Sequence, residues 1–153
     1  MKTFSRLGIG AILIFSGGTF AHEGATGIVK ERMDLMSSIA DGSKLVGDML
    51  KGKREMDFAA IINAAQLNQN HAARIPELFP DSEESRKGHK TEALPVIWER
   101  WSEFESLAKK LEEESARLAE LAETANKQAI RKQFLKVAKS CRGCHSDFRK
   151  PKD

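Results

Sequence analysis

Residues 130–148 read IRKQFLKVAKSCRGCHSDF, and this stretch decides both the fold class and the chemistry that we expect. Its apolar positions recur at alternating spacings of four and three residues, which is the period of an amphipathic helix. These positions are Ile130, Phe134, Val137, Cys141, Cys144 and Phe148. Because both cysteines share the apolar face, the motif Cys-Arg-Gly-Cys-His is expected on the buried side of a C-terminal helix.

Three further amphipathic helices are expected upstream of this one. The apolar periodicity covers about residues 25–50 and 55–75, and a third stretch begins near Pro95 and continues to about residue 122. Glycine and proline gather between these segments, and no alternating strand pattern is present. Four such helices around a shared apolar stripe predict an all-α fold, an antiparallel four-helix bundle.

The N-terminus predicts export. A short basic segment precedes an apolar run over residues 7–15, and small residues follow, which is the form of a secretory signal peptide. The run is too short for a membrane-spanning helix. We expect residues 1–21 to be cleaved, which leaves residues 22–153 as a single soluble, periplasmic domain without membrane insertion. Cleavage lowers the formal charge of +3 to about +1 and leaves no basic block suited to nucleic acid.

Three alternatives for the cysteine motif agree poorly with the rest of the chain. A structural zinc site needs four ligands, whereas the chain has two cysteines and its other histidines are scattered. A thioredoxin-like pair belongs at a helix N-terminus after a strand, not near the end of a last helix. A disulfide at this spacing would have to distort the helix.

The remaining interpretation is covalent haem, because Cys-x-x-Cys-His is the attachment signature of a c-type haem. Cys141 and Cys144 would add to the haem vinyl groups, and His145 would be the proximal iron ligand. The export signal agrees, since bacteria attach this haem outside the cytoplasm. We therefore predict one haem c beside the C-terminal helix.

The first helix offers candidates for the other side of the iron. Met36 lies about 60° from the centre of that helix's apolar stripe, and Met33 lies about 120° from it, so Met36 is the better candidate. Arg32 lies near the centre, where a buried guanidinium needs an anion such as a haem propionate. The alternatives are that Met36 fills the core and that Arg32 extends to solvent. His71 and His89 are expected on the surface.

These residues resemble the class II c-type cytochromes, the cytochrome c′ family and its low-spin relatives. The resemblance covers essentially the whole mature chain and includes ERMDLM at 31–36, LFP at 78–80, TEALPVIW at 91–98 and CRGCHSDFRK at 141–150. It implies that Arg149 lies in the proximal pocket and Arg32 near the propionates. It also implies that Met36 stands where low-spin members carry an axial methionine.

Two functions follow from this resemblance, and neither is enzymatic. The first is a one-electron carrier with His145 and Met36 as axial ligands, which exchanges electrons with periplasmic redox proteins. The alternative is a five-coordinate, high-spin cytochrome c′ that binds nitric oxide or carbon monoxide. The resemblance further implies that a homodimer can form through the first two helices.

Overall fold

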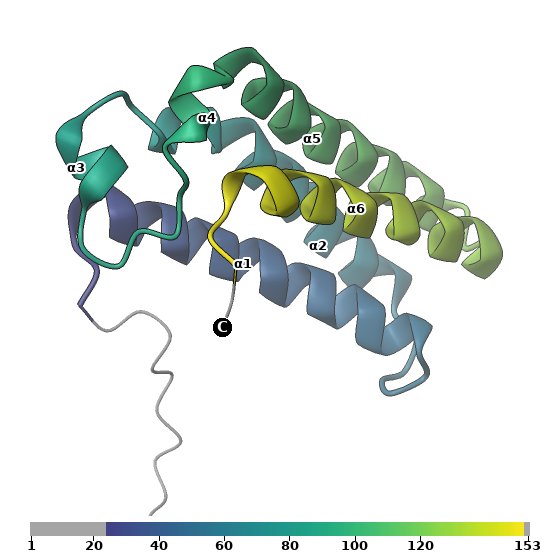
Figure 1. Ribbon diagram of the computed structural model, residues 1–153. Coiled ribbons are helices and arrows are strands. Elements are labelled where there is room, and N and C mark those ends of the chain that lie inside the picture. Colours follow the sequence, from purple (N-terminus) through teal and green to yellow (C-terminus); the bar gives the residue numbers. More distant parts are fainter. Residues whose placement is uncertain (1–23, 152–153) are drawn as a thin grey trace, which may run out of the picture.

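The computed structural model describes residues 24–151, so the expected signal peptide and its cleavage site lie outside the described residues. Four long helices form an antiparallel bundle, as the apolar periodicity predicted (Figure 1). They are α1 (Gly27–Leu50), α2 (Phe58–Arg74), α5 (Trp101–Glu123) and α6 (Lys127–Phe148). No strand is present in the described part of the chain, where the only β-type pairing is the bridge between Ala93 and Arg149.

Side-chain caps fix where α2 and α6 begin. The Asp57 carboxylate accepts a hydrogen bond from Ala60 N at 3.0 Å, so α2 begins at residue 58 rather than at the expected 55. The Asn126 side chain accepts from Ala129 N at 3.0 Å and starts α6. Between α5 and α6, Ala125 takes a φ of 53°, which lets the chain reverse within three residues.

The connection from α2 to α5 contains three short helices, of which the first two were not predicted and the third begins the helix expected from Pro95. They are η2 (Pro76–Leu78), α3 (Glu83–Lys87) and α4 (Val96–Glu99). The continuous helix expected from Pro95 is therefore wrong, because the chain breaks at Arg100, whose φ and ψ are −114° and 43°.

Contacts on both sides of the break explain it. The Arg100 guanidinium binds Glu103 at 2.6 Å and Asp147 at 3.3 Å and lies 5.2 Å from the Phe148 ring centre. On the other side, Trp98 Nε1 donates to the carbonyl of Phe79 at 3.0 Å. These contacts hold α4 and α5 in different orientations.

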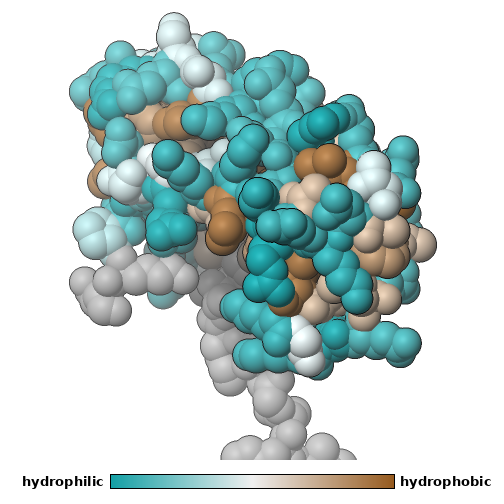
Figure 2. Space-filling view, turned by 90° about the vertical axis from the view of Figure 1, so that its right-hand side faces the viewer, coloured by the Kyte–Doolittle hydropathy of each residue, from teal (hydrophilic) through white to brown (hydrophobic). Residues whose placement is uncertain are grey.

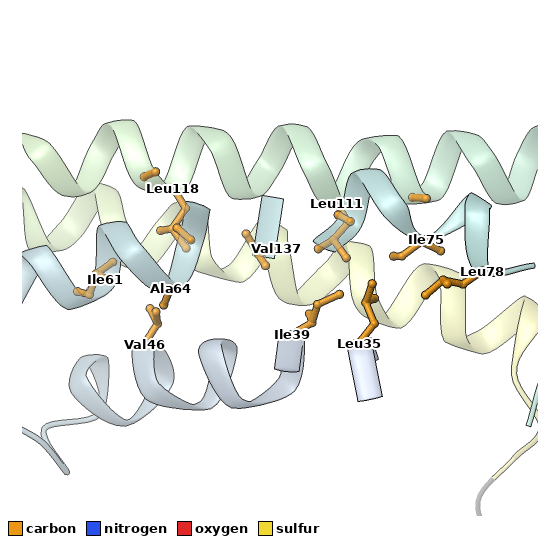
Figure 3. Packing of buried hydrophobic residues seen from close by; sticks show 14 of the residues in the cluster. Leu35, Ile39, Val46, Ile61, Ala64, Ile75, Leu78, Leu111, Leu118 and Val137 are labelled. Atoms are coloured by element: carbon orange, nitrogen blue, oxygen red, sulfur yellow. The ribbon is translucent and has the colours of Figure 1, made fainter. Parts of the chain in front are cut away.

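The core is a continuous apolar cluster along the bundle axis. Side chains from the four long helices and from residues 75–79 interdigitate there (Figure 3). The labelled members are Leu35, Ile39, Val46, Ile61, Ala64, Ile75, Leu78, Leu111, Leu118 and Val137. Burial of this cluster supplies the main driving force that holds the helices together.

The four long helices do not pack equally closely against one another. α5 packs extensively on α2 and α6, whereas α1 and α6 touch each other little. None of the described helices is long and apolar enough to cross a membrane. The end of the molecule shown in Figure 2 is mostly hydrophilic, with apolar side chains visible between polar ones. The looser side, between α1 and α6, is where the functional residues gather.

Candidate haem site

A cavity of about 440 Å³ opens between α1, α5 and α6. All six residues singled out in the sequence line it, although they come from opposite ends of the chain. They are Arg32, Met36, Cys141, Cys144, His145 and Arg149. The structure thus brings the predicted site together, and the role of each residue toward a haem stays a prediction.

α6 contributes the cysteine motif to the cavity. Cys141 and Cys144 are unpaired thiols, half-buried among core side chains. Burial raises the pKa of both, and the pKa of Cys144 rises to about 11 through burial and then through the nearby Cys141 and Asp147. Both thiols are therefore protonated at neutral pH in the haem-free chain. His145, one residue on, is half-buried in the last turn of the helix.

Arg32 is the most deeply buried charge of the site. Its side chain is only 5% exposed, and its Nη2 donates to the carbonyl oxygen of Ser85 at 2.9 Å and to the Ser85 hydroxyl at 3.0 Å. The Phe79 ring lies 4.4 Å from the guanidinium carbon. Desolvation lowers the pKa of Arg32, and the charge of Glu84 partly opposes this. The solvent-reaching alternative for Arg32 is therefore wrong.

Arg149 follows the last turn of α6 and is held in place by backbone pairing. Leu94 N donates to the Phe148 carbonyl at 3.0 Å, and Lys150 N donates to the Glu92 carbonyl at 2.8 Å. This strap fastens residues 92–94 to the end of α6 and closes one end of the cavity. It also keeps the Arg149 side chain at the cavity wall, where its Nε is buried.

The α1 wall holds two methionines, not one. Met36 and Met33 are both half-buried and both line the cavity. The sequence analysis favoured Met36 over Met33 because it measured the angle of each residue from the centre of the apolar stripe. The cavity lies to one side of that stripe, so a residue far from the core centre still faces it.

Other contributors were not identified as site residues from the sequence. Leu107 and Leu111 of α5 line the cavity, and Ser85 holds Arg32 from the short helix α3. The α5 periodicity predicts that Leu111 is buried, but it does not predict that Leu111 lines a cavity. Nothing in the sequence pairs Ser85 with a residue 53 positions away.

His71 is less exposed than the sequence suggested. Its Nε2 lies 3.0 Å from the Ser38 hydroxyl, so it joins α2 to α1. Burial, followed by the charge of Arg74, lowers the pKa of His71. The surface assignment was wrong for His71, because the buried face of α2 runs through Ala64 and Asn68 and places His71 beside α1. His89 is exposed, as expected.

The cavity fits a haem on its own chemistry. A mainly apolar lining suits the macrocycle, while the buried Nε and Nη1 of Arg32 and Nε of Arg149 have no hydrogen-bond partner among residues 24–151. Buried guanidinium nitrogens without partners indicate a missing anion, and haem carries two propionates. The thiols and imidazole that would hold the group line the same space.

Comparisons with known proteins identify the family of this chain. Residues 27–149 match the family model described as Cytochrome C′. The chain is similar to cytochrome c′ of Rhodopseudomonas palustris, with 29% identity over 94% of this chain and 93% of the relative. It is also similar to cytochrome c-556 of Agrobacterium fabrum, with 28% identity over 82% of both chains.

Solved structures show the same fold. The structure of cytochrome c′ from Rhodopseudomonas palustris superposes with a TM-score of 0.76 at 26% identity, covering 84% of this chain and 99% of that one. A nitric oxide complex of a variant of cytochrome c prime from Alcaligenes xylosoxidans gives 0.71 at 22% identity, covering 81% and 94%. The chain therefore belongs to the cytochrome c′ family, whose cofactor is one covalently bound c-type haem.

Proposed function

We propose that this chain is a periplasmic monohaem cytochrome c′ that binds a small neutral diatomic, nitric oxide or carbon monoxide, on the α1 side of its haem. The observation that carries the proposal is the apolar character of that side. Ile39 and Ala40 of α1 and Leu107 of α5 line the cavity beside the two methionines. Such a wall admits small neutral molecules and disfavours anions, which would lose their hydration there.

The chain's own side chains fix the geometry of the site. When bound, the haem would supply an iron that changes oxidation state by one electron. Cys141 and Cys144 would hold the macrocycle, and His145 would ligate the iron. Arg32 and Arg149 would neutralise the propionates from two sides of the cavity.

A second candidate function is one-electron transfer, in which Met36 would be a second protein ligand of the iron. It rests on one observation: the Met36 thioether lines the same cavity as His145. The family names of the relatives favour the diatomic-binding proposal, because several carry the name cytochrome c′. Both functions use the same proximal residues and differ only at Met36.

Visible absorption spectra of holoprotein purified from periplasm separate the two. We would compare wild type with Met36→Leu and with Met33→Leu as the matched control, each oxidised, reduced, and reduced under carbon monoxide. The proposal expects a broad reduced Soret band in all three proteins and a shift on adding carbon monoxide. Met36→Leu should leave these spectra nearly unchanged, because no iron bond is lost.

The opposite result would establish the carrier. In that case the reduced wild type shows sharp, split bands, and the oxidised wild type shows a weak far-red band from methionine ligation. Met36→Leu abolishes that band and opens the iron to carbon monoxide, and Met33→Leu does neither. A colourless periplasmic protein would contradict both functions.

The proposed location has its own test. The mature protein should be recovered from the periplasmic fraction with His22 as its first residue, because Ala21 and Thr19 supply the small side chains that signal cleavage favours. The intact mass of the purified protein measures this directly. Retention of the first 21 residues would contradict the proposed cleavage.

A further inference from the structure

Charge is distributed unevenly between the two helices that follow each other at the end of the chain. α6 carries six lysines and arginines against one aspartate, whereas α5 carries seven glutamates against three lysines and arginines. The chain as a whole is close to neutral, with a formal charge of +3. The positive charge is therefore concentrated on the helix that carries the cysteine motif.

Part of this charge forms a defined surface, which we call the α6 outer patch. It consists of Lys132, Leu135, Lys136, Lys139 and Arg142. Their spacing of three or four residues places them on one side of the helix, opposite the buried residues Ile130 and Val137. All five are exposed, and α6 is an outer helix of the bundle (Figure 1).

The cations of the patch have no ion-pair partners in the described part of the chain. Basic residues elsewhere do: Lys109 binds Glu112 and Arg117 binds Glu120 on the neighbouring α5. None of the ion pairs among residues 24–151 involves a cation of the α6 outer patch. Like charges three and four residues apart disfavour a helix, so this row is held in place by the bundle and not by its own charges.

Leu135 gives the patch an apolar centre. It is 62% exposed, and Leu67, at 43%, is the other exposed large apolar residue among residues 24–151. Lys132 and Lys139 are its neighbours on the helix surface, one turn before it and one turn after it. An apolar side chain surrounded by charges resembles the centre and rim of a protein–protein interface.

We infer that the α6 outer patch is the docking site for a redox protein with an acidic surface. The position suits electron exchange, because the patch ends at Arg142 inside the haem-attachment motif and only the diameter of one helix, about 10 Å, separates it from the cavity side. Unpaired cations steer an acidic partner, and Leu135 provides an apolar contact after encounter. The electron path rests on the proposed haem site, whereas the docking rests on the charges of the patch and on Leu135.

Two other occupants fit less well. A membrane-surface helix needs a broad apolar face toward the lipid, whereas the apolar face of α6 is buried in the bundle and the outer patch has one leucine. A second copy bound patch to patch would bring like charges together.

Reduced flavodoxin, an acidic one-electron donor protein, is a suitable probe. The rate of haem reduction by flavodoxin hydroquinone would be followed by stopped-flow absorption at increasing ionic strength. Two triple variants of equal net charge are compared: Lys132→Glu, Lys136→Glu, Lys139→Glu in the patch, and Lys53→Glu, Lys87→Glu, Lys110→Glu at exposed positions outside α6. Leu135→Ser tests the apolar centre.

The patch triple should slow reduction at low ionic strength by about tenfold or more, and the control triple by about threefold or less. Wild type should lose this advantage as salt rises. Leu135→Ser should weaken binding by about fivefold while keeping the salt dependence. Equal slowing by both triples would overturn the inference, since it would reflect net charge only.

Further measurements address the other occupants and the haem itself. Wild type that sediments with phosphatidylglycerol vesicles, with unchanged flavodoxin rates in the patch triple, would overturn the inference in favour of a membrane. Salt-sensitive self-association lost in the patch triple would overturn it in favour of a second copy. Calorimetric titration with oxidised flavodoxin measures the affinity of docking independently of haem reduction. A failure of the proposed function and a failure of docking therefore give different results.

Discussion

Arg32 and Ser85 join α1 to the short helix α3 through one guanidinium nitrogen. Nη2 makes both bonds, to the Ser85 carbonyl at 2.9 Å and to its hydroxyl at 3.0 Å, while the buried Nε and Nη1 have no partner in the described part of the chain. One arginine thus joins α1 to α3, lines the cavity and keeps two buried donors for a ligand. The unfavourable burial of this charge is consistent with a haem propionate completing the site.

Arg32→Met should destabilise the haem-loaded protein more than the haem-free one. Without haem, the variant loses two bonds but also relieves a desolvated charge, so the two effects largely offset each other. With haem, it also removes the partner of a propionate, and the added loss should be about 1–3 kcal/mol. Urea unfolding followed by circular dichroism measures both forms, the haem-free form being made with Cys141→Ala and Cys144→Ala.

Ser85→Ala is the matched control for that experiment. It removes only the hydroxyl acceptor, so it should lower the free energy of unfolding by about 1 kcal/mol in both forms. Equal losses for Arg32→Met with and without haem would contradict a role of Arg32 toward the propionates.

Gly88→Ala should loosen α3 from α1. A Cβ at this position would collide with the Glu84 carbonyl and stand 2.6 Å from Val29 Cγ2. Because the Glu84 carbonyl belongs to the backbone, the chain must shift, and overpacking of this kind costs about 1–3 kcal/mol. Thermal unfolding measures the loss, with the exposed Lys87→Ala expected to change stability little. Unchanged stability in Gly88→Ala would show that the α3 turn is not held against Val29.

His71 should make stability depend on pH in the mildly acidic range. Its pKa is lowered below the usual 6.5 in the native state, so the unfolded chain takes up the proton first as the pH falls. Stability is therefore full above about pH 6.5 and declines below it until the native pKa is reached.

Equilibrium unfolding between neutral and mildly acidic pH tests this dependence. His71→Gln should reduce the decline, whereas the exposed His89→Gln should leave it unchanged. An identical decline in His71→Gln and wild type would mean that other groups cause it.

Phe79→Leu should weaken the end of the cavity that Arg32 occupies. The Phe79 ring contacts the Arg32 guanidinium at 4.4 Å and meets the Phe104 ring edge-on, with 4.8 Å between ring centres. Loss of both contacts and of part of the buried ring should lower the free energy of unfolding by about 1–2 kcal/mol. Leu67→Ala, at an exposed position, should change it by less than about 0.5 kcal/mol. Similar losses in both variants would contradict the role assigned to Phe79.

Local sequence was enough for the four long helices, because each buries one face at helical spacing. The same periodicity placed both cysteines on the inner side of α6 and Arg32 on the inner side of α1. It did not predict the break at Arg100, which depends on Asp147 and on carbonyls at residues 79 and 80. Those partners are distant in the sequence, so no periodicity reports them.

By itself the sequence determined the helical class, the cysteine motif with its adjacent histidine, and the charge on the outer side of α6, because these depend on spacing along one helix. Only the tertiary structure decided that α1 and α6 leave room between them, that Met33 joins Met36 at the cavity, and that Ser85 binds Arg32. These features depend on how helices from opposite ends of the chain pack, and the free energy of that packing is shared among contacts that no single segment contains.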